Sequence, residues 1–157
     1  MRGKQAPRRE ILPDPVYNSS TVAKFINYLM VNGKKSVAQK AFYNALKIIE
    51  TKNGEKGEKG LDVFDKAIRN VSPLVEVKAR RIGGANYQVP IEVRGDRRFN
   101  LASTWIIGAA RSRKGKPMAE KLAMEFTDAA AEQGEAIKKK LDVHRMAESN
   151  RAFAHFA

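Results

Sequence analysis

The sequence of 157 residues contains no cysteine, only two histidines and a single tryptophan. Without cysteine there is no disulfide framework, no zinc knuckle and no thiol nucleophile. The two histidines, His144 and His155, have no partner at a metal-ligand spacing. No apolar run approaches the roughly 18 residues of a membrane span, and no apolar stretch follows the basic N-terminus as a secretory signal requires. We therefore expect a soluble intracellular protein that uses no metal.

Acidic side chains are also scarce, because 17 Asp and Glu stand against 30 Lys and Arg, for a net charge of +13. Almost all of the excess lies in two stretches: residues 1–40 have a net charge of +6 and residues 71–121 a net charge of +7. Clustered positive charge is typical of a surface that binds a polyanion. The length and the 43% apolar content predict one globular domain over residues 1–157.

Hydrophobic spacing predicts a mainly helical fold. Three prolines among residues 1–17 favour an extended basic arm there. Apolar side chains then recur with the helical period over six segments: 22–29, 37–49, 61–70, 101–110, 118–129 and 136–147. Candidate N-cap residues precede the first segment, and Gly134 separates the last two. Residues 148–157 form a C-terminal tail without a clear pattern.

The period changes to two between the third and fourth helical segments. Val75, Val77 and Ala79 alternate with polar residues, as do Tyr87 and Val89 after a Gly-Gly pair. This pattern predicts one β-hairpin within residues 72–93, protruding between helices three and four. Because an isolated two-stranded ribbon is marginally stable, it must lean on a helix at its base or be held by a partner at its tip.

The hairpin turn carries the most informative residues, Arg80-Arg81-Ile82-Gly83-Gly84-Ala85-Asn86-Tyr87. Guanidinium groups bind phosphates or stack on bases, glycines allow close backbone approach, and an aromatic ring stacks or packs. The alternative is an ordinary solvent-exposed turn. The strongly basic surroundings favour a nucleic-acid-binding finger.

Other basic clusters are more ambiguous. Residues 111–117 resemble a flexible phosphate clamp or a solvated loop, and Lys34-Lys35 lies at a helix start where anions are favoured. A solvated surface explains residues 138–140 as well as a contact does. Trp105 lies on an apolar stripe, so we expect it in the core. The carboxylates Glu120, Glu125, Asp128, Glu132 and Glu135 resemble solvated helix faces.

No catalytic arrangement is visible, since nothing assembles a nucleophile, a base and an orienting group. We therefore expect no enzyme activity, no cofactor, no small-molecule substrate and no membrane association. Two alternatives remain: a DNA-architectural protein, for which only Ile82 offers an apolar wedge at the arm tip, and an RNA-modifying enzyme, for which no acid–base or cofactor site is visible.

Four long segments resemble the bacterial-type small-subunit ribosomal protein seven family. They are Arg9-Glu10-Ile11-Leu12-Pro13-Asp14-Pro15, the stretch 22–36 with Asn32-Gly33-Lys34-Lys35-Ser36, residues 77–90, and residues 144–155. Their order and spacing match the family over nearly the whole chain. The resemblance implies a helical domain with a protruding hairpin, in agreement with the periodicity.

The resemblance also implies a function. Members of this family bind the 3′ major domain of 16S-type rRNA and nucleate assembly of the subunit head. Their hairpin and C-terminal region lie near the exit-site tRNA and the mRNA. Their neighbours are head proteins nine, thirteen and nineteen and platform protein eleven. A bacterial cytoplasmic ribosome is the expected location, with an organelle ribosome as the alternative.

Two sets of residues are carried over by position. The rRNA-binding set is Arg8, Arg9, Lys34, Lys35, Arg94, Arg97, Arg98, Arg111, Arg113, Lys114 and Lys116. The set near the exit-site tRNA and mRNA is Arg80, Arg81, Gly83, Gly84, Asn86, Arg145, Asn150 and Arg151. The chain departs from many relatives at Thr104, where they have a basic residue, and in ending Phe156-Ala157 instead of with an aromatic–Arg pair.

Overall fold

The computed structural model describes residues 3, 9–52 and 59–156. The chain divides into two compact units, residues 1–39 and residues 40–157, and each is described by itself. Residues 1–2 and 4–8 of the predicted arm, including Arg8, lie outside the described residues, as does the loop 53–58. Residues 9–14 form neither helix nor strand.

In the first unit, a turn leads into helix α1 (Ser20–Leu29). The Asp14 side chain is buried and accepts hydrogen bonds from the backbone N–H groups of Val16 and Tyr17, both at 3.1 Å. Ser19 is the N-cap, since its hydroxyl accepts from the N–H of Val22 at 3.4 Å. The Ser19 bond satisfies a backbone donor that the helix leaves unpaired, and the Asp14 bonds satisfy two donors of the preceding turn. Helix α2 (Lys35–Lys52) begins in this unit and continues into the second.

The second unit contains the remaining elements. They are α3 (Gly60–Val71), strands β1 (Val75–Ile82) and β2 (Ala85–Glu92), α4 (Gly95–Ser112), α5 (Met118–Ala130), α6 (Glu135–Ser149) and a 3-10 helix η1 (Arg151–Phe156). The prediction of six helices with a hairpin between the third and fourth is confirmed, and η1 orders most of the tail. No helix in the described ranges is both long and apolar enough to cross a membrane.

Three phenylalanines from three helices form the centre of the second unit's core. Phe42, Phe64 and Phe126 are fully buried, with ring centroids 5.3 to 6.2 Å apart and edge-to-face geometry. Edge-to-face pairs are favoured because the positive ring edge meets the negative ring face. α5 packs against α3 and α4, so this cluster lies where helices of the second unit's core meet.

The two strands are antiparallel, with Val75 opposite Glu92 and Ile82 opposite Ala85. Directly opposed residues share a face of the ribbon. The two-residue turn at Gly83-Gly84, both with positive φ, therefore places the odd-numbered residues of β1 opposite even-numbered residues of β2. The two apolar alternations of the sequence lie on opposite faces. One face carries Tyr87, Val89 and Ile91, and the other Val75, Val77 and Ala79.

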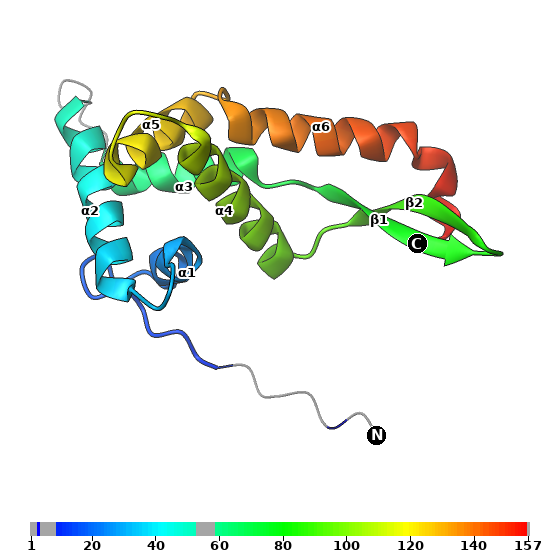
Figure 1. The fold of residues 1–157 in the computed structure, drawn as a ribbon, viewed down its shortest axis with the longest axis horizontal. Helices are drawn as coiled ribbons and strands as arrows, with labels where there is room; N and C mark the ends of the chain where they lie inside the picture. Colours follow the sequence, from blue (N-terminus) through cyan, green and yellow to red (C-terminus); the bar gives the residue numbers. More distant parts are fainter. Residues whose placement is uncertain (1–2, 4–8, 53–58, 157) are drawn as a thin grey trace. The chain divides into compact units, whose positions relative to one another are not determined.

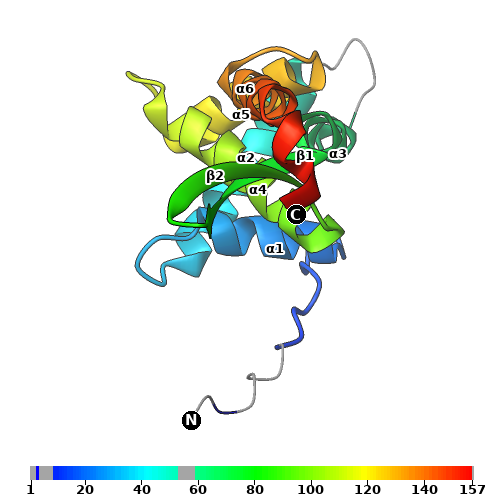
Figure 2. The same cartoon turned by 90° about the vertical axis from the view of Figure 1, so that its right-hand side faces the viewer.

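The hairpin is supported along its length by the C-terminal segment. α6 runs beside β1, and η1 turns back onto β2 (Figure 1). The view turned by 90° again places η1 next to the ribbon (Figure 2). The sequence predicts support either from a helix at the hairpin's base or from a partner at its tip. In the structure, helices of the same chain support the hairpin, and their contacts extend beyond its base.

Candidate nucleic-acid interface

The side chains near the hairpin tip fall into two groups, those that contact the C-terminal tail and one that faces solvent. Arg80 donates from Nη1 to the backbone carbonyl of Phe156 at 2.7 Å. The Tyr87 ring packs against Phe153 and Phe156, with centroids 5.3 and 5.5 Å apart. Arg81, by contrast, is exposed, and the described structure gives its side chain no hydrogen bond or ion pair. Tyr87 and Arg80 thus hold the hairpin against the tail, and Arg81 points its charge to solvent.

A second group of arginines lies where the hairpin meets α4. The Glu76 side chain is 11% exposed, and its Oε2 accepts from Nε and Nη2 of Arg97, both at 3.3 Å. Lys78 lies 3.1 Å from Oε1 of the same carboxylate. Arg98 donates to the carbonyl of Val93 at 3.3 Å. Arg97 and Arg98 therefore fix the hairpin base to the first turn of α4.

The third group centres on Glu125, which is fully buried. Its Oε2 accepts from Arg113 at 2.6 and 3.0 Å, and its Oε1 accepts from the N–H of Ala136 at 3.2 Å. Arg113 also donates to Asp128 at 2.5 Å. The expectation that Glu125 lies on a solvated face is wrong, because the carboxylate compensates its burial with a guanidinium and a helix N–H.

The environment of Arg113 also affects its protonation. Burial acts to lower the pKa of its guanidinium, but the hydrogen bonds to Glu125 and Asp128 raise that pKa above its usual value. The guanidinium is therefore held charged at any physiological pH. These contacts tie the loop before α5 to the first turn of α6.

The remaining predicted rRNA-binding residues are exposed. Arg9, Lys34, Lys35, Arg94 and Lys114 have exposed side chains for which the described structure gives no hydrogen bond or ion pair. Lys116 contacts the sulfur of Met124 at 3.7 Å, and Arg111 is exposed at the last turn of α4. Because α4 has 18 residues, the clusters at its two ends lie about 25 Å apart.

The predicted exit-site residues near the C-terminus lie on α6 and η1. Arg145 and Arg151 are exposed and form loose ion pairs with Asp142 at 3.8 Å and Glu148 at 3.6 Å. Asn150 donates to the carbonyl of Met146 at 2.7 Å. Gly83, Gly84 and Asn86 are exposed at the hairpin turn. The structure thus brings together the hairpin and the tail, the two segments that carry the predicted exit-site residues.

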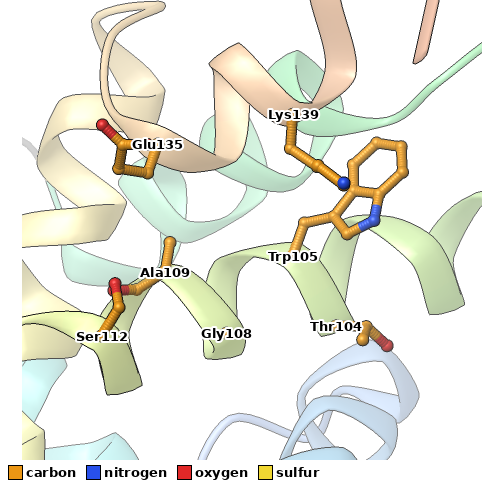
Figure 3. A pocket seen from close by; sticks show the side chains of 7 residues that line it. All are labelled: Thr104, Trp105, Gly108, Ala109, Ser112, Glu135 and Lys139. Atoms are coloured by element: carbon orange, nitrogen blue, oxygen red, sulfur yellow. The ribbon is translucent and has the colours of Figure 1, made fainter. Parts of the chain in front are cut away.

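Trp105 does not lie in the core, contrary to the expectation from its apolar stripe. It is half-buried and lines a pocket of about 290 Å³ between α4 and α6. Gly108, Ala109 and Ser112 continue the α4 side of the pocket, and Glu135 and Lys139 reach it from α6 (Figure 3). Because Ala102, Ile106 and Ala110 already fill the buried face of α4, the indole remains at the surface.

His144 has a structural partner. Its Nε2 accepts a hydrogen bond from the N–H of Leu74 at 3.1 Å, which requires that nitrogen to be unprotonated. Burial lowers the pKa of the imidazole, and the positive charge of Lys140 lowers it further. Among the described residues, no group of three or more His, Asp or Glu side chains could hold a metal ion.

A comparison with known families decides the chain's relationship. The family model described as ribosomal protein S7p/S5e matches residues 1–151. The chain belongs to this family. A Nitratiruptor protein named small ribosomal subunit protein uS7 is 59% identical over 156 residues, covering 99% of both chains. Proteins of the same name from Sulfurovum and Pelotomaculum thermopropionicum are 55% and 57% identical, the first over 99% of both chains and the second over 96% of this chain and 94% of its own.

The S7p/S5e family is a family of ribosomal structural proteins and not of enzymes, and RNA binding and translation follow from it. The resemblance stated from the motifs is confirmed. No local sequence pattern indicates that Glu76 and Glu125 are buried, because their arginine partners lie 21 and 12 residues away.

Proposed function

We propose that this protein is a component of the small ribosomal subunit that binds rRNA through its exposed basic side chains. The observation that carries the proposal is the family match over residues 1–151. The charge distribution supports it, because phosphate neutralisation by Lys and Arg is the main source of affinity for nucleic acid. A-form RNA presents phosphates and shape rather than readable major-groove edges, which suits a rigid basic surface.

The finer assignments belong to the same proposal. The protein binds the 3′ major domain of 16S-type rRNA and nucleates assembly of the subunit head. The hairpin and the tail face the exit-site tRNA and the mRNA. Head proteins nine, thirteen and nineteen and platform protein eleven are its neighbours. The bacterial sources of the relatives support a ribosome in the bacterial cytoplasm. We also propose that residues 1–157 act as a single RNA-binding domain.

The predicted rRNA-binding residues divide into two groups by their contacts. Arg97, Arg98 and Arg113 are bonded within the protein and fix the ends of α4. Their neighbours Arg94 and Lys114 are exposed. In the proposed mechanism the bonded arginines hold the backbone in place and add long-range positive potential, and the exposed side chains meet phosphates directly.

The test removes two exposed charges and compares the salt dependence of RNA binding. The variant Arg94→Ala with Lys114→Ala is measured against the 3′ major domain transcript over a range of salt concentrations. The slope of log affinity against log salt should become shallower by roughly two. A matched control, Lys47→Ala with Lys66→Ala, removes the same charge from exposed positions in the near-neutral stretch 41–70. Equal slopes for the two variants would contradict the assignment.

A further inference from the structure

The chain's only tryptophan is partly exposed at a pocket that the proposed rRNA contacts do not use. The buried face of α4 is formed by other residues, among them Ala102 and Ile106, which are both fully buried. The indole is therefore not needed to complete the buried face of α4, and it lines the pocket instead. Aromatic rings in this position are the usual platforms on which unpaired bases stack.

One of the residues that line the pocket, the exposed Gly108, has no side chain. A Cβ built at Gly108 would meet nothing within 4 Å, although the position is inside a regular helix. Glycine lowers helix stability by about 1 kcal/mol relative to alanine. Together with Ala109, Gly108 leaves about 290 Å³ beside the indole. A flat ring can enter this space from solvent.

The charge at the pocket suits a phosphate. Lys139 lines the pocket and is exposed, and the described structure gives its side chain no hydrogen bond or ion pair. Its two neighbours are occupied: Lys138 lies 2.7 Å from Glu135, and Lys140 donates to the carbonyl of Asn70 at 2.6 Å. Since Lys138 already pairs with Glu135, the ammonium of Lys139 is left for an external anion.

The pocket also lies on the line between the two basic clusters of α4. Arg97, Thr104, Gly108 and Arg111 follow one another at steps of seven, four and three residues, which places them along one helix face. Arg97 and Arg111 are about 21 Å apart along the axis. An RNA strand that met both ends of this face would pass over the Trp105 pocket.

We propose that the pocket formed by Trp105, Gly108 and Lys139 receives one unpaired nucleotide of the rRNA. Its base stacks on the indole, and its phosphate pairs with the Lys139 ammonium. Stacking accepts any base, so this site adds affinity rather than sequence preference. The inference rests on the proposed rRNA-binding function and adds to it a site for single-stranded RNA.

Because there is one tryptophan, 5-fluorotryptophan labels this site alone. The ¹⁹F resonance of the labelled full chain is recorded with hexaadenylate, with a six-base-pair RNA duplex and with the 3′ major domain transcript. Stacking should shift the resonance with hexaadenylate and with the transcript, but not with the duplex. Gly108→Leu adds a bulky side chain at the pocket and should abolish the shift. The substitution is compatible with the helix, because leucine is a better helix former than glycine.

Affinity for the transcript gives a second readout. Gly108→Leu should weaken binding about tenfold, the loss of one stacked base, whereas Gly108→Ala should stay close to the parent protein. Lys139→Gln should make the salt slope shallower by roughly one, and the matched variant Lys138→Gln should not. Circular dichroism of each variant establishes that the helices are intact.

The outcomes separate the site from the overall function. If the labelled protein binds the transcript with full affinity and the resonance does not move, the nucleotide site is wrong and the rRNA-binding function stands. If the resonance moves only when other small-subunit proteins are added, the pocket holds a protein segment and the proposal is overturned. If the transcript is not bound at all under low salt, the proposed function fails first.

Discussion

The guanidinium of Arg113 lies 2.6 Å from the carboxylate of Glu125, which is completely buried between α5 and the first turn of α6. This pair joins the basic loop after α4 to two helices at once. A residue that charge alone assigns to phosphate binding is thus also a structural link of the second unit. Its removal has consequences that differ from those of removing an exposed cation.

Arg113→Ala should lower the free energy of unfolding by about 3 kcal/mol, because it leaves the Glu125 carboxylate buried without its cation. Lys114→Ala, at the adjacent exposed position, should change the same quantity by less than about 0.5 kcal/mol. Urea unfolding followed by circular dichroism measures both. A similar small effect of the two substitutions would show that the Arg113–Glu125 pair contributes little to stability.

The aromatic contact between hairpin and tail makes a separate prediction. Tyr87→Ala removes the ring that packs on Phe153 and Phe156, so amide hydrogen exchange in residues 85–92 should accelerate several-fold. Tyr87→Phe keeps the ring and loses only the hydroxyl, and should exchange at nearly the parent rate. Exchange measured by mass spectrometry distinguishes them. Unchanged protection in Tyr87→Ala would mean that α6 alone supports the ribbon.

The helices could be predicted from the sequence because their apolar residues recur at the helical period and their ends carry recognisable signals. Ser19 caps α1 and Gly134 precedes α6, as the pattern indicates. The buried state of Glu76 and Glu125 could not be predicted, since it depends on arginines that only the tertiary fold brings near. The position of Trp105 depends on how α6 crosses α4, which periodicity does not determine.

The hairpin shows the same limit in a different way. Alternation in each strand indicated two half-buried strands, and the turn glycines indicated their connection. Which faces the apolar residues share depends on the loop length, and a two-residue turn places Val77 and Val89 on opposite sides of the ribbon. The two faces are buried to different extents, since Val89 is fully buried and Val77 is half-buried.

The hairpin tip should be separable from the body of the protein. Replacing residues 81–86 by Asn-Gly joins Arg80 to Tyr87 through a two-residue turn and keeps their cross-strand pairing. The contacts of both residues with the tail are outside the replaced segment. We expect unchanged affinity for the 3′ major domain transcript and altered retention of exit-site tRNA in reconstituted subunits. Failure of the shortened protein to support head assembly would refute this separation.

The hydrogen bond between His144 and Leu74 predicts a pH dependence of stability. The pKa of His144 is lower in the folded protein than in the unfolded chain. When the pH falls below the pKa of the unfolded chain, the unfolded state therefore binds more protons than the folded state. The stabilising contribution is therefore fully present above about pH 6.5 and is lost as the pH falls through the lower folded pKa. Protonation of Nε2 also removes the acceptor for the Leu74 N–H at the base of the hairpin.

The substitution His144→Gln isolates this effect. The glutamine amide oxygen can accept from the Leu74 N–H and does not titrate. The other histidine, His155, is exposed on η1 and is the same in both proteins, so the comparison isolates position 144. Urea unfolding of the two proteins between pH 7.5 and about pH 5 measures the difference in unfolding free energy. The parent protein should lose stability relative to His144→Gln as the pH falls. A difference that stays constant with pH would show that the imidazole is equally easy to protonate in the folded and unfolded states.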